Sequence, residues 1–325
     1  MPRLTSKKTL ALAFSLLMPV VCWAQTGEPV ETIRVDSDLV DLRVSVVSLN
    51  PKKATSELQQ QDFQVFEDGK PQDISFFASA ETPFDLVLLL DLSGSTNNKI
   101  KLIRKSAKKF VEASRAFDRV SVVTFSSVAQ VVCPLTQDRQ LLKKSIDHIQ
   151  KPEGGTNFWD SLRYVLAILN ASRTSSRRSA VVVMTDGVDN ALPEVFGDGS
   201  QTPFDELVQI VQTSDAIVFP IYLHTEEEGV KRYRTPRSAF VLAREQLGEL
   251  ASASGTTLYR AERLEDLNDV YQQVIGDLGR IYSIGYRPSN PSKDGKWRAV
   301  SVRVVDRQDV LARTKHGYFS GNATN

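Results

Sequence analysis

Residues 83–96 read Pro-Phe-Asp-Leu-Val-Leu-Leu-Leu-Asp-Leu-Ser-Gly-Ser-Thr, and this stretch decides how the rest of the chain is interpreted. Its apolar run ends abruptly at Asp91, a pattern typical of a strand that is buried on both faces and then enters a polar loop. In open parallel sheets, ligands bind beyond the carboxyl ends of the strands. The loop that begins at Asp91 and contains Ser93 and Ser95 is therefore the first candidate site.

Strands and helices alternate between Asp85 and Leu278, which predicts an α/β fold. The expected strands are 86–90, 120–125, 128–135, 180–184, 216–223 and 257–259, and the expected helices are 100–114, 139–149, 159–169, 204–212, 240–253 and 264–278. Only strands 120–125 and 128–135 have a connection short enough for a hairpin. We therefore expect a mostly parallel, doubly wound, Rossmann-like sheet with one reversed edge strand.

Short strands on both sides of this region predict a small β module. Apolar and polar residues alternate from Ile33 to Leu49, and further strands are expected at 63–67, 74–77, 282–286, 297–305 and 317–319. We expect an N-terminal β module at residues 25–82, an α/β domain at 83–279 and C-terminal β strands at 280–325. The strands at the two ends would pack together as one small β sandwich around the inserted α/β domain.

The first 24 residues have the pattern of a secretory signal peptide. Basic residues precede an apolar stretch from Leu10 to Val21, and cleavage is expected after Ala24. A retained anchor is the alternative, but this apolar stretch is short and Pro19 interrupts it. Lipidation at Cys22 is another, although the preceding Val21 is bulky for that signal. We expect a secreted or periplasmic protein with no membrane span after signal removal.

Charge and cysteine content narrow the possible functions. Removing residues 1–24 changes the balance from 40 basic and 39 acidic residues to 37 and 39, so bulk charge does not favour nucleic-acid binding. Cys133 is the one cysteine that remains, and an apolar strand surrounds it. We interpret it as a buried thiol, so the exported chain would be stabilised by burial without an internal disulfide.

Three separate motifs combine into one candidate metal site. The loop with Asp91, Ser93 and Ser95 follows the first buried strand, Thr156 ends the Gly154-Gly155-Thr156 motif before a helix, and Asp186 follows strand 180–184. All three can reach one edge of the sheet. Their hydroxyls and carboxylates are hard oxygen donors, which suit Mg²⁺, Mn²⁺ or Ca²⁺ better than zinc. Taken singly, each motif could equally be a helix cap or an ordinary turn.

Together, the motifs resemble the metal-ion-dependent adhesion site of von Willebrand factor type A (VWA) domains. The resemblance implies that Ser93, Ser95 and Thr156 bind the ion directly or with the help of water, while Asp91 and Asp186 hold it mainly through water. The flanking residues 62–72, 285–286, 294–298 and 317–319 resemble a bacterial, acidobacterial-type branch of VWA-related proteins. The resemblance further implies Mg²⁺ (or Mn²⁺ or Ca²⁺) as cofactor and a protein partner that supplies an acidic residue to the ion.

The neighbourhood of this site offers further candidates. Glu153, Asn157, Trp159 and Asp189 lie beside the ligand loops, where packing is the simpler interpretation and shaping of a partner surface the alternative. The charged segment His224–Arg237 follows a strand, so it should lie on the same edge as the ion, as a solvated loop or as a partner-selecting lid. The basic stretch Arg173–Ser179 precedes a strand and should lie at the opposite edge.

No catalytic machinery is recognisable in the sequence. The histidines at 148, 224 and 316 do not form a triad pattern with Ser93 or Ser95, and Ser93 occupies the position where a haloacid-dehalogenase phosphotransferase needs a second aspartate. We therefore predict that the chain is not an enzyme but an exported, metal-dependent protein-binding or adhesion module. The alternatives are a structural VWA scaffold with a weak or unused metal site and, less favoured, a metal-assisted hydrolase.

Overall fold

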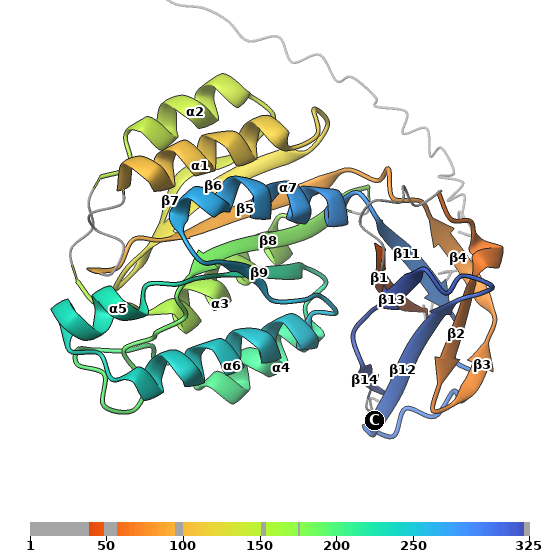
Figure 1. Ribbon diagram of the computed structural model, residues 1–325. Coiled ribbons are helices and arrows are strands. Elements are labelled where there is room, and N and C mark those ends of the chain that lie inside the picture. The colour runs from red at the N-terminus through yellow and green to blue at the C-terminus, as the bar shows by residue number, and fades with distance from the viewer. Residues whose placement is uncertain (1–38, 49–56, 95–99, 151–153, 175, 322–325) are drawn as a thin grey trace, which may run out of the picture. The chain divides into compact units, whose positions relative to one another are not determined.

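A six-stranded sheet lies at the centre of the α/β domain in the computed structural model, which describes residues 39–48, 57–94, 100–150, 154–174 and 176–321 (Figure 1). Its order is β10-β9-β8-β5-β6-β7. The strands are β5 Phe84–Asp91, β6 Arg119–Phe125, β7 Ala129–Thr136, β8 Arg178–Thr185, β9 Ile217–Leu223 and β10 Tyr259–Ala261. All pairs are parallel except β6 with β7, so the predicted mostly parallel sheet with one reversed edge strand is confirmed.

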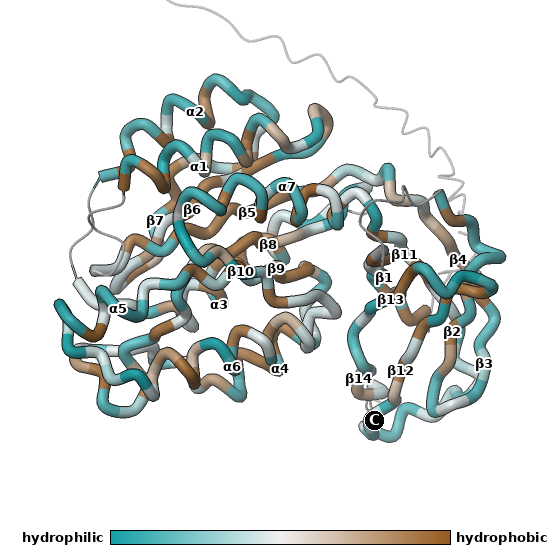
Figure 2. The backbone as a smooth tube through the Cα atoms, viewed as in Figure 1, coloured by the Kyte–Doolittle hydropathy of each residue, from teal (hydrophilic) through white to brown (hydrophobic). Residues whose placement is uncertain are grey.

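Helices cover both faces of this sheet because β5 is apolar on both sides. Leu86, Leu88 and Leu90 belong to one buried cluster, whereas Val87 and Leu89 belong to the other. The first cluster includes residues of α1 Ile100–Ala113, α2 Arg139–Asp147 and α7 Leu267–Leu278; the second includes residues of α3 Phe158–Ala171, α4 Phe204–Thr213 and α6 Arg237–Ala253. Figure 2 shows apolar residues along the strands between these two layers.

The strands near both ends of the chain form two antiparallel sheets of four strands each. The first has the order β13-β1-β11-β4 and the second β14-β12-β2-β3. Their strands are β1 Val40–Ser48, β2 Phe63–Glu67, β3 Lys70–Gln72, β4 Ile74–Ala78, β11 Ile281–Tyr286, β12 Trp297–Val304, β13 Val310–Arg313 and β14 Gly317–Phe319. Val44 and Ile284 from the first sheet and Val65 and Val302 from the second share one buried cluster. Each sheet therefore combines strands from before and after the α/β domain.

Some element boundaries differ from the sequence prediction. Strand β10 lies two residues later than expected, because the Thr256 hydroxyl donates to the Val218 and Ala251 carbonyls and holds its segment beside β9 and the end of α6. Strand β13 was not expected, since its four residues show no clear alternation; pairing with β1 defines it. Part of the predicted loop 224–237 is helical, with α5 Glu226–Glu228 followed by a π-helical turn, Gly229–Tyr233.

The remaining expectations about the chain's organisation stay predictions. The signal peptide 1–24 and the start of the first expected strand lie outside the described residues. Within the described ranges, no helix is both long and apolar enough to cross a membrane. We retain domain boundaries near residues 82 and 279 as a proposal, since β5 begins at Phe84 and α7 ends at Leu278.

Candidate functional site

Asp91 connects two loops at the carboxyl edge of the central sheet. It is the last residue of β5 and is completely buried. Its Oδ1 accepts a hydrogen bond of 2.8 Å from the Ser93 amide, and its Oδ2 accepts one of 2.6 Å from the Thr185 hydroxyl at the end of β8. The first ligand loop and the loop that carries Asp186 are therefore joined through this one carboxylate.

Asp186 is almost completely buried, at 2% exposure, and accepts hydrogen bonds from two segments. Its Oδ1 accepts a hydrogen bond of 3.1 Å from the Val188 amide, and its Oδ2 accepts one of 2.5 Å from the Thr225 hydroxyl, which follows β9. Burial and the nearby Asp186 charge together raise the pKa of Asp91 above its ordinary value. Two carboxyl groups are thus placed close together in a region that disfavours their combined negative charge.

Thr156 reaches the same place from the loop before α3. Its amide donates to the Asn190 side-chain oxygen at 3.2 Å, and its carbonyl accepts from the Asn190 amide at 2.9 Å. The Gly155 amide donates to the Ser127 hydroxyl at 2.9 Å, which fixes the glycine loop against the turn after β6. Thr156 is 7% exposed, so backbone and side-chain contacts position it before any ligand arrives.

Ser93, Thr156 and Asp186 line one cavity of about 610 Å³. They come from three loops that are far apart in the chain but meet at one edge of the sheet, as the parallel strand order requires. Ser95 and Glu153 lie outside the described residues. Among the described residues, no group of three or more His, Cys, Asp or Glu side chains could hold a metal ion. Two carboxylates and several hydroxyls, by contrast, match the oxygen donors that Mg²⁺ and Ca²⁺ prefer.

The other candidates beside the site have packing roles. Asp189 accepts hydrogen bonds from the Trp159 amide at 3.0 Å, from the Ala191 amide at 2.8 Å and from the Ser200 hydroxyl at 2.6 Å. It therefore joins the start of α3 to the loop after β8. The Trp159 ring is 6% exposed and lies 5.6 Å from the Phe204 ring. Asn157 lines the cavity, and its amide donates to the Ser126 carbonyl.

Three contacts to the ligand loops were not predicted, although two of the residues, Thr225 and Tyr233, belong to the segment 224–237 that was expected at this edge. Thr225 binds Asp186, Asn190 binds Thr156, and the Tyr233 hydroxyl donates to the Gly94 carbonyl at 2.6 Å. Thr225 could have been found, because it is a polar residue just beyond the carboxyl end of a buried strand. Tyr233 could not, because the π-helical turn that brings it to Gly94 has no sequence signal. The segment 224–237 does lie at this edge.

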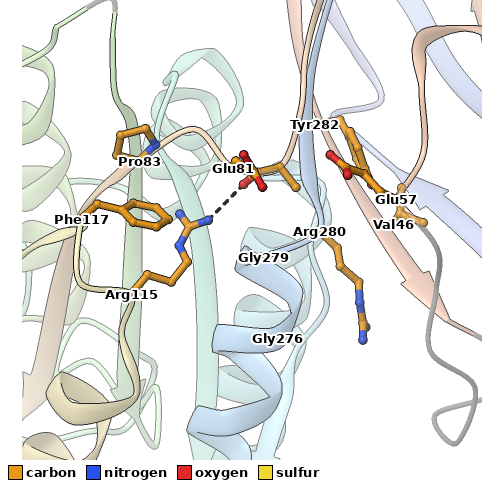
Figure 3. A pocket seen from close by; sticks show the side chains of 11 residues that line it. Val46, Glu57, Glu81, Pro83, Arg115, Phe117, Gly276, Gly279, Arg280 and Tyr282 are labelled. Atoms are coloured by element: carbon orange, nitrogen blue, oxygen red, sulfur yellow. Dashed lines mark hydrogen bonds between the residues drawn. The ribbon is translucent and has the colours of Figure 1, made fainter.

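A second cavity, with a volume of about 680 Å³, is lined both by residues of the α/β domain, such as Phe117, and by Val46 of β1 and Tyr282 of β11 (Figure 3). Arg115 and Arg280 line it, but their charges are already engaged within the fold. Arg115 donates to the Ala80 carbonyl at 3.0 Å and pairs with Asp118, and Arg280 lies 3.6 Å from Asp277. We assign this cavity no binding role. None of the three histidines lines either cavity: His148, His224 and His316 lie beside Lys144, Glu262 and Ser252 respectively.

Comparison with known proteins agrees with this geometry. Residues 86–188, which include the loops of Asp91 and Asp186, match the family model of the von Willebrand factor type A domain. The chain contains a VWA domain. This confirms the resemblance inferred from the three motifs, while its assignment to the acidobacterial-type branch stays a prediction.

Individual relatives of the VWA domain are distant. An uncharacterized protein of Borreliella burgdorferi is 24% identical over 151 residues, which cover 44% of this chain and 42% of that protein. The UPF0353 protein of Nocardia farcinica is 23% identical over 243 residues, covering 68% and 69%. Proximal thread matrix protein 1 of the mussel byssus, solved with zinc in its metal-ion-dependent adhesion site, is 16% identical with a TM-score of 0.44, covering 60% and 48%. The chain thus spans less than half of the Borreliella protein.

Proposed function

We propose that this protein is an exported module that binds a protein partner through a divalent metal ion, without catalysing a reaction. Ser93, Thr156 and Asp186 would hold the ion together with Asp91 and the predicted ligand Ser95. The observation that carries the proposal is that Ser93, Thr156 and Asp186, from three separate loops, line one cavity, while a second buried carboxyl group, that of Asp91, accepts a hydrogen bond from the Ser93 amide. A divalent cation would offset the charge that burial disfavours there.

The donor set also explains why an outside group would bind. The bound ion supplies an electrophilic centre for an oxygen ligand. Mg²⁺ usually keeps several waters and takes only one or two carboxylates from a protein site. If the direct ligands are neutral hydroxyls and the two aspartates act through water, the ion would have no anionic ligand in direct contact, and an Asp or Glu side chain of a partner would supply one. Mg²⁺ is the expected ion, with Mn²⁺ or Ca²⁺ as alternatives.

Metal binding is tested by following the melting temperature of the purified exported chain during titration with Mg²⁺ or Mn²⁺. A ligand at 100 times its Kd stabilises the folded state by about 2.7 kcal/mol. We expect a saturable rise in melting temperature that the Thr156→Val variant reduces and the Asp186→Asn variant abolishes. Thr213→Val is the matched control, because its hydroxyl lies at the exposed end of α4. An unchanged melting temperature in wild type would contradict the metal site.

A further inference from the structure

The cavity over the candidate metal site has an apolar side as well as a polar one. Val188, Val195, Phe196, Tyr233 and Phe240 line it together with the hydroxyl and carboxylate residues. Its volume of about 610 Å³ exceeds what one carboxylate group needs and lies in the range of sites that bury a whole ligand. The hydroxyl and carboxylate residues therefore form only part of the cavity lining.

Phe196 is the most exposed of these apolar side chains. The residue is 83% exposed, the largest value among the exposed large hydrophobic residues of the described chain. Burial of an aromatic ring supplies much of the binding energy at protein interfaces, and such rings are enriched among the residues that dominate binding. A phenylalanine exposed at the rim of a polar site is therefore a candidate contact for a partner.

The loop that carries Phe196 is held on both sides of that residue. The neighbouring Val195 packs against the second core cluster, and Leu192 is 3% exposed. On the other side, Ser200 donates to Asp189 through both its amide and its hydroxyl. Gly197 has a φ of +109°, and a Cβ there would meet the Asn190 side chain at 2.3 Å. The ring is thus presented from a fixed backbone, which limits the entropy lost on binding.

The segment after β9 forms another part of the cavity lining, with Tyr233 and Phe240. The Tyr233 hydroxyl donates to the Gly94 carbonyl, and Phe240 is 1% exposed below Gly229. Both parts of the lining are tied to the ligand loops, since Thr225 binds Asp186 and Asn190 binds Thr156. A ligand group that reaches the ion would therefore lie beside apolar side chains at fixed positions.

We propose that the partner segment carries an Asp or Glu next to a bulky apolar residue, and that Phe196 and Tyr233 contact this apolar residue while the carboxylate binds the ion. This inference rests on the proposed function. It adds a specificity element, because a metal ion alone would accept any accessible carboxylate, whereas the apolar wall would select the residue beside it.

Selection from random peptides tests this proposal. Phage-displayed peptides are selected on the full exported chain in Mg²⁺ and eluted with EDTA. We expect enrichment of Asp or Glu with a neighbouring Phe, Leu, Ile, Met or Trp. The best sequence is then made as a synthetic peptide, and its Kd is measured for wild type, for Phe196→Ser and for Tyr164→Ser. Tyr164 is the control because it is a 45% exposed aromatic residue on α3 that does not line the cavity.

We expect Phe196→Ser to bind the peptide with about tenfold lower affinity, which corresponds to 1.4 kcal/mol, and Tyr164→Ser to bind it with unchanged affinity. Melting temperatures of both variants should match wild type, because both side chains are exposed. Enrichment of carboxylates without an apolar neighbour, or equal affinity for Phe196→Ser, would overturn the specificity element and leave the proposed function standing. If no carboxylate peptide is enriched in Mg²⁺, both the specificity element and the proposed function are contradicted. The metal titration then shows whether the protein fails to bind the ion or binds the ion but no partner.

Discussion

Strand β5 has a buried aspartate at each end, and the two have opposite electrostatic environments. At the amino end, Asp85 accepts hydrogen bonds from Arg119 at 2.8 and 2.5 Å and from Arg177 at 2.6 Å. Burial favours a higher pKa for Asp85, but the hydrogen bonds and charges of both arginines outweigh it and lower the pKa. At the carboxyl end, burial and Asp186 raise the pKa of Asp91.

The difference separates a structural charge cluster from the one proposed to bind a metal ion. The amino-end cluster contains its own cations and also joins segments of the fold, since the buried Arg178 side chain donates to the carbonyls of Ala78, Ser79 and Ile281 and to the Ser283 hydroxyl. Ala78 is the last residue of β4, Ser79 follows it, and Ile281 and Ser283 belong to β11, so Arg178 ties the start of β8 to the first antiparallel sheet. The carboxyl-end cluster instead brings two carboxyl groups together, at a cost in stability that a bound cation would offset.

The largest effect is expected from removing the buried arginine of the structural cluster. Arg178→Met would leave the carbonyls of Ala78, Ser79 and Ile281 without this donor, and we expect a loss of about 3–5 kcal/mol in the free energy of unfolding. Urea denaturation measures it. Arg173→Met is the control, because the Arg173 side chain is 53% exposed and should change stability by less than about 1 kcal/mol. If the two substitutions changed stability equally, the structural role assigned to Arg178 would be contradicted.

A pair of matched substitutions at the two ends of β5 compares the clusters directly. Without divalent metal, Asp85→Asn should cost about 2–3 kcal/mol, because Arg119 and Arg177 lose their charged partner. Asp91→Asn should change stability by less than about 1 kcal/mol, because it also removes the repulsion with Asp186. Urea denaturation in EDTA measures both. Equal destabilisation by the two substitutions would show that the ends of the strand do not differ in this way.

The smallest expected effect is the pH dependence of the stability that Asp85 contributes at the amino end of β5. Because the folded-state pKa of Asp85 is lowered, its contribution to stability is present above its ordinary value of 3.8 and is lost as the pH falls through the lowered pKa. The stability difference between wild type and Asp85→Asn should therefore shrink as the pH falls below 3.8. Denaturation curves at several pH values in EDTA measure this difference. A difference that stays constant down to pH 2 would contradict the assignment.

The sequence alone was enough to predict the central sheet and much of the candidate site. A continuous apolar run such as Leu86–Leu90 is typical of a strand in a parallel sheet, where helices cover both faces. Polar residues just beyond such strands must lie at one edge, so the meeting of Asp91, Ser93, Thr156 and Asp186 follows from local patterns and strand direction. The alternation of short strands likewise predicted the β sandwich.

Only the tertiary structure could reveal how these residues are held and what surrounds them. The bonds from Thr225 to Asp186, from Asn190 to Thr156 and from Tyr233 to Gly94 join segments far apart in the chain, and each depends on the detailed path of a loop. The exposed ring of Phe196 beside the site could not be predicted from the sequence either, because a single apolar residue in a loop has no periodicity that shows which way it faces. Local chemistry thus determined the position of the site, and long-range packing determined its walls.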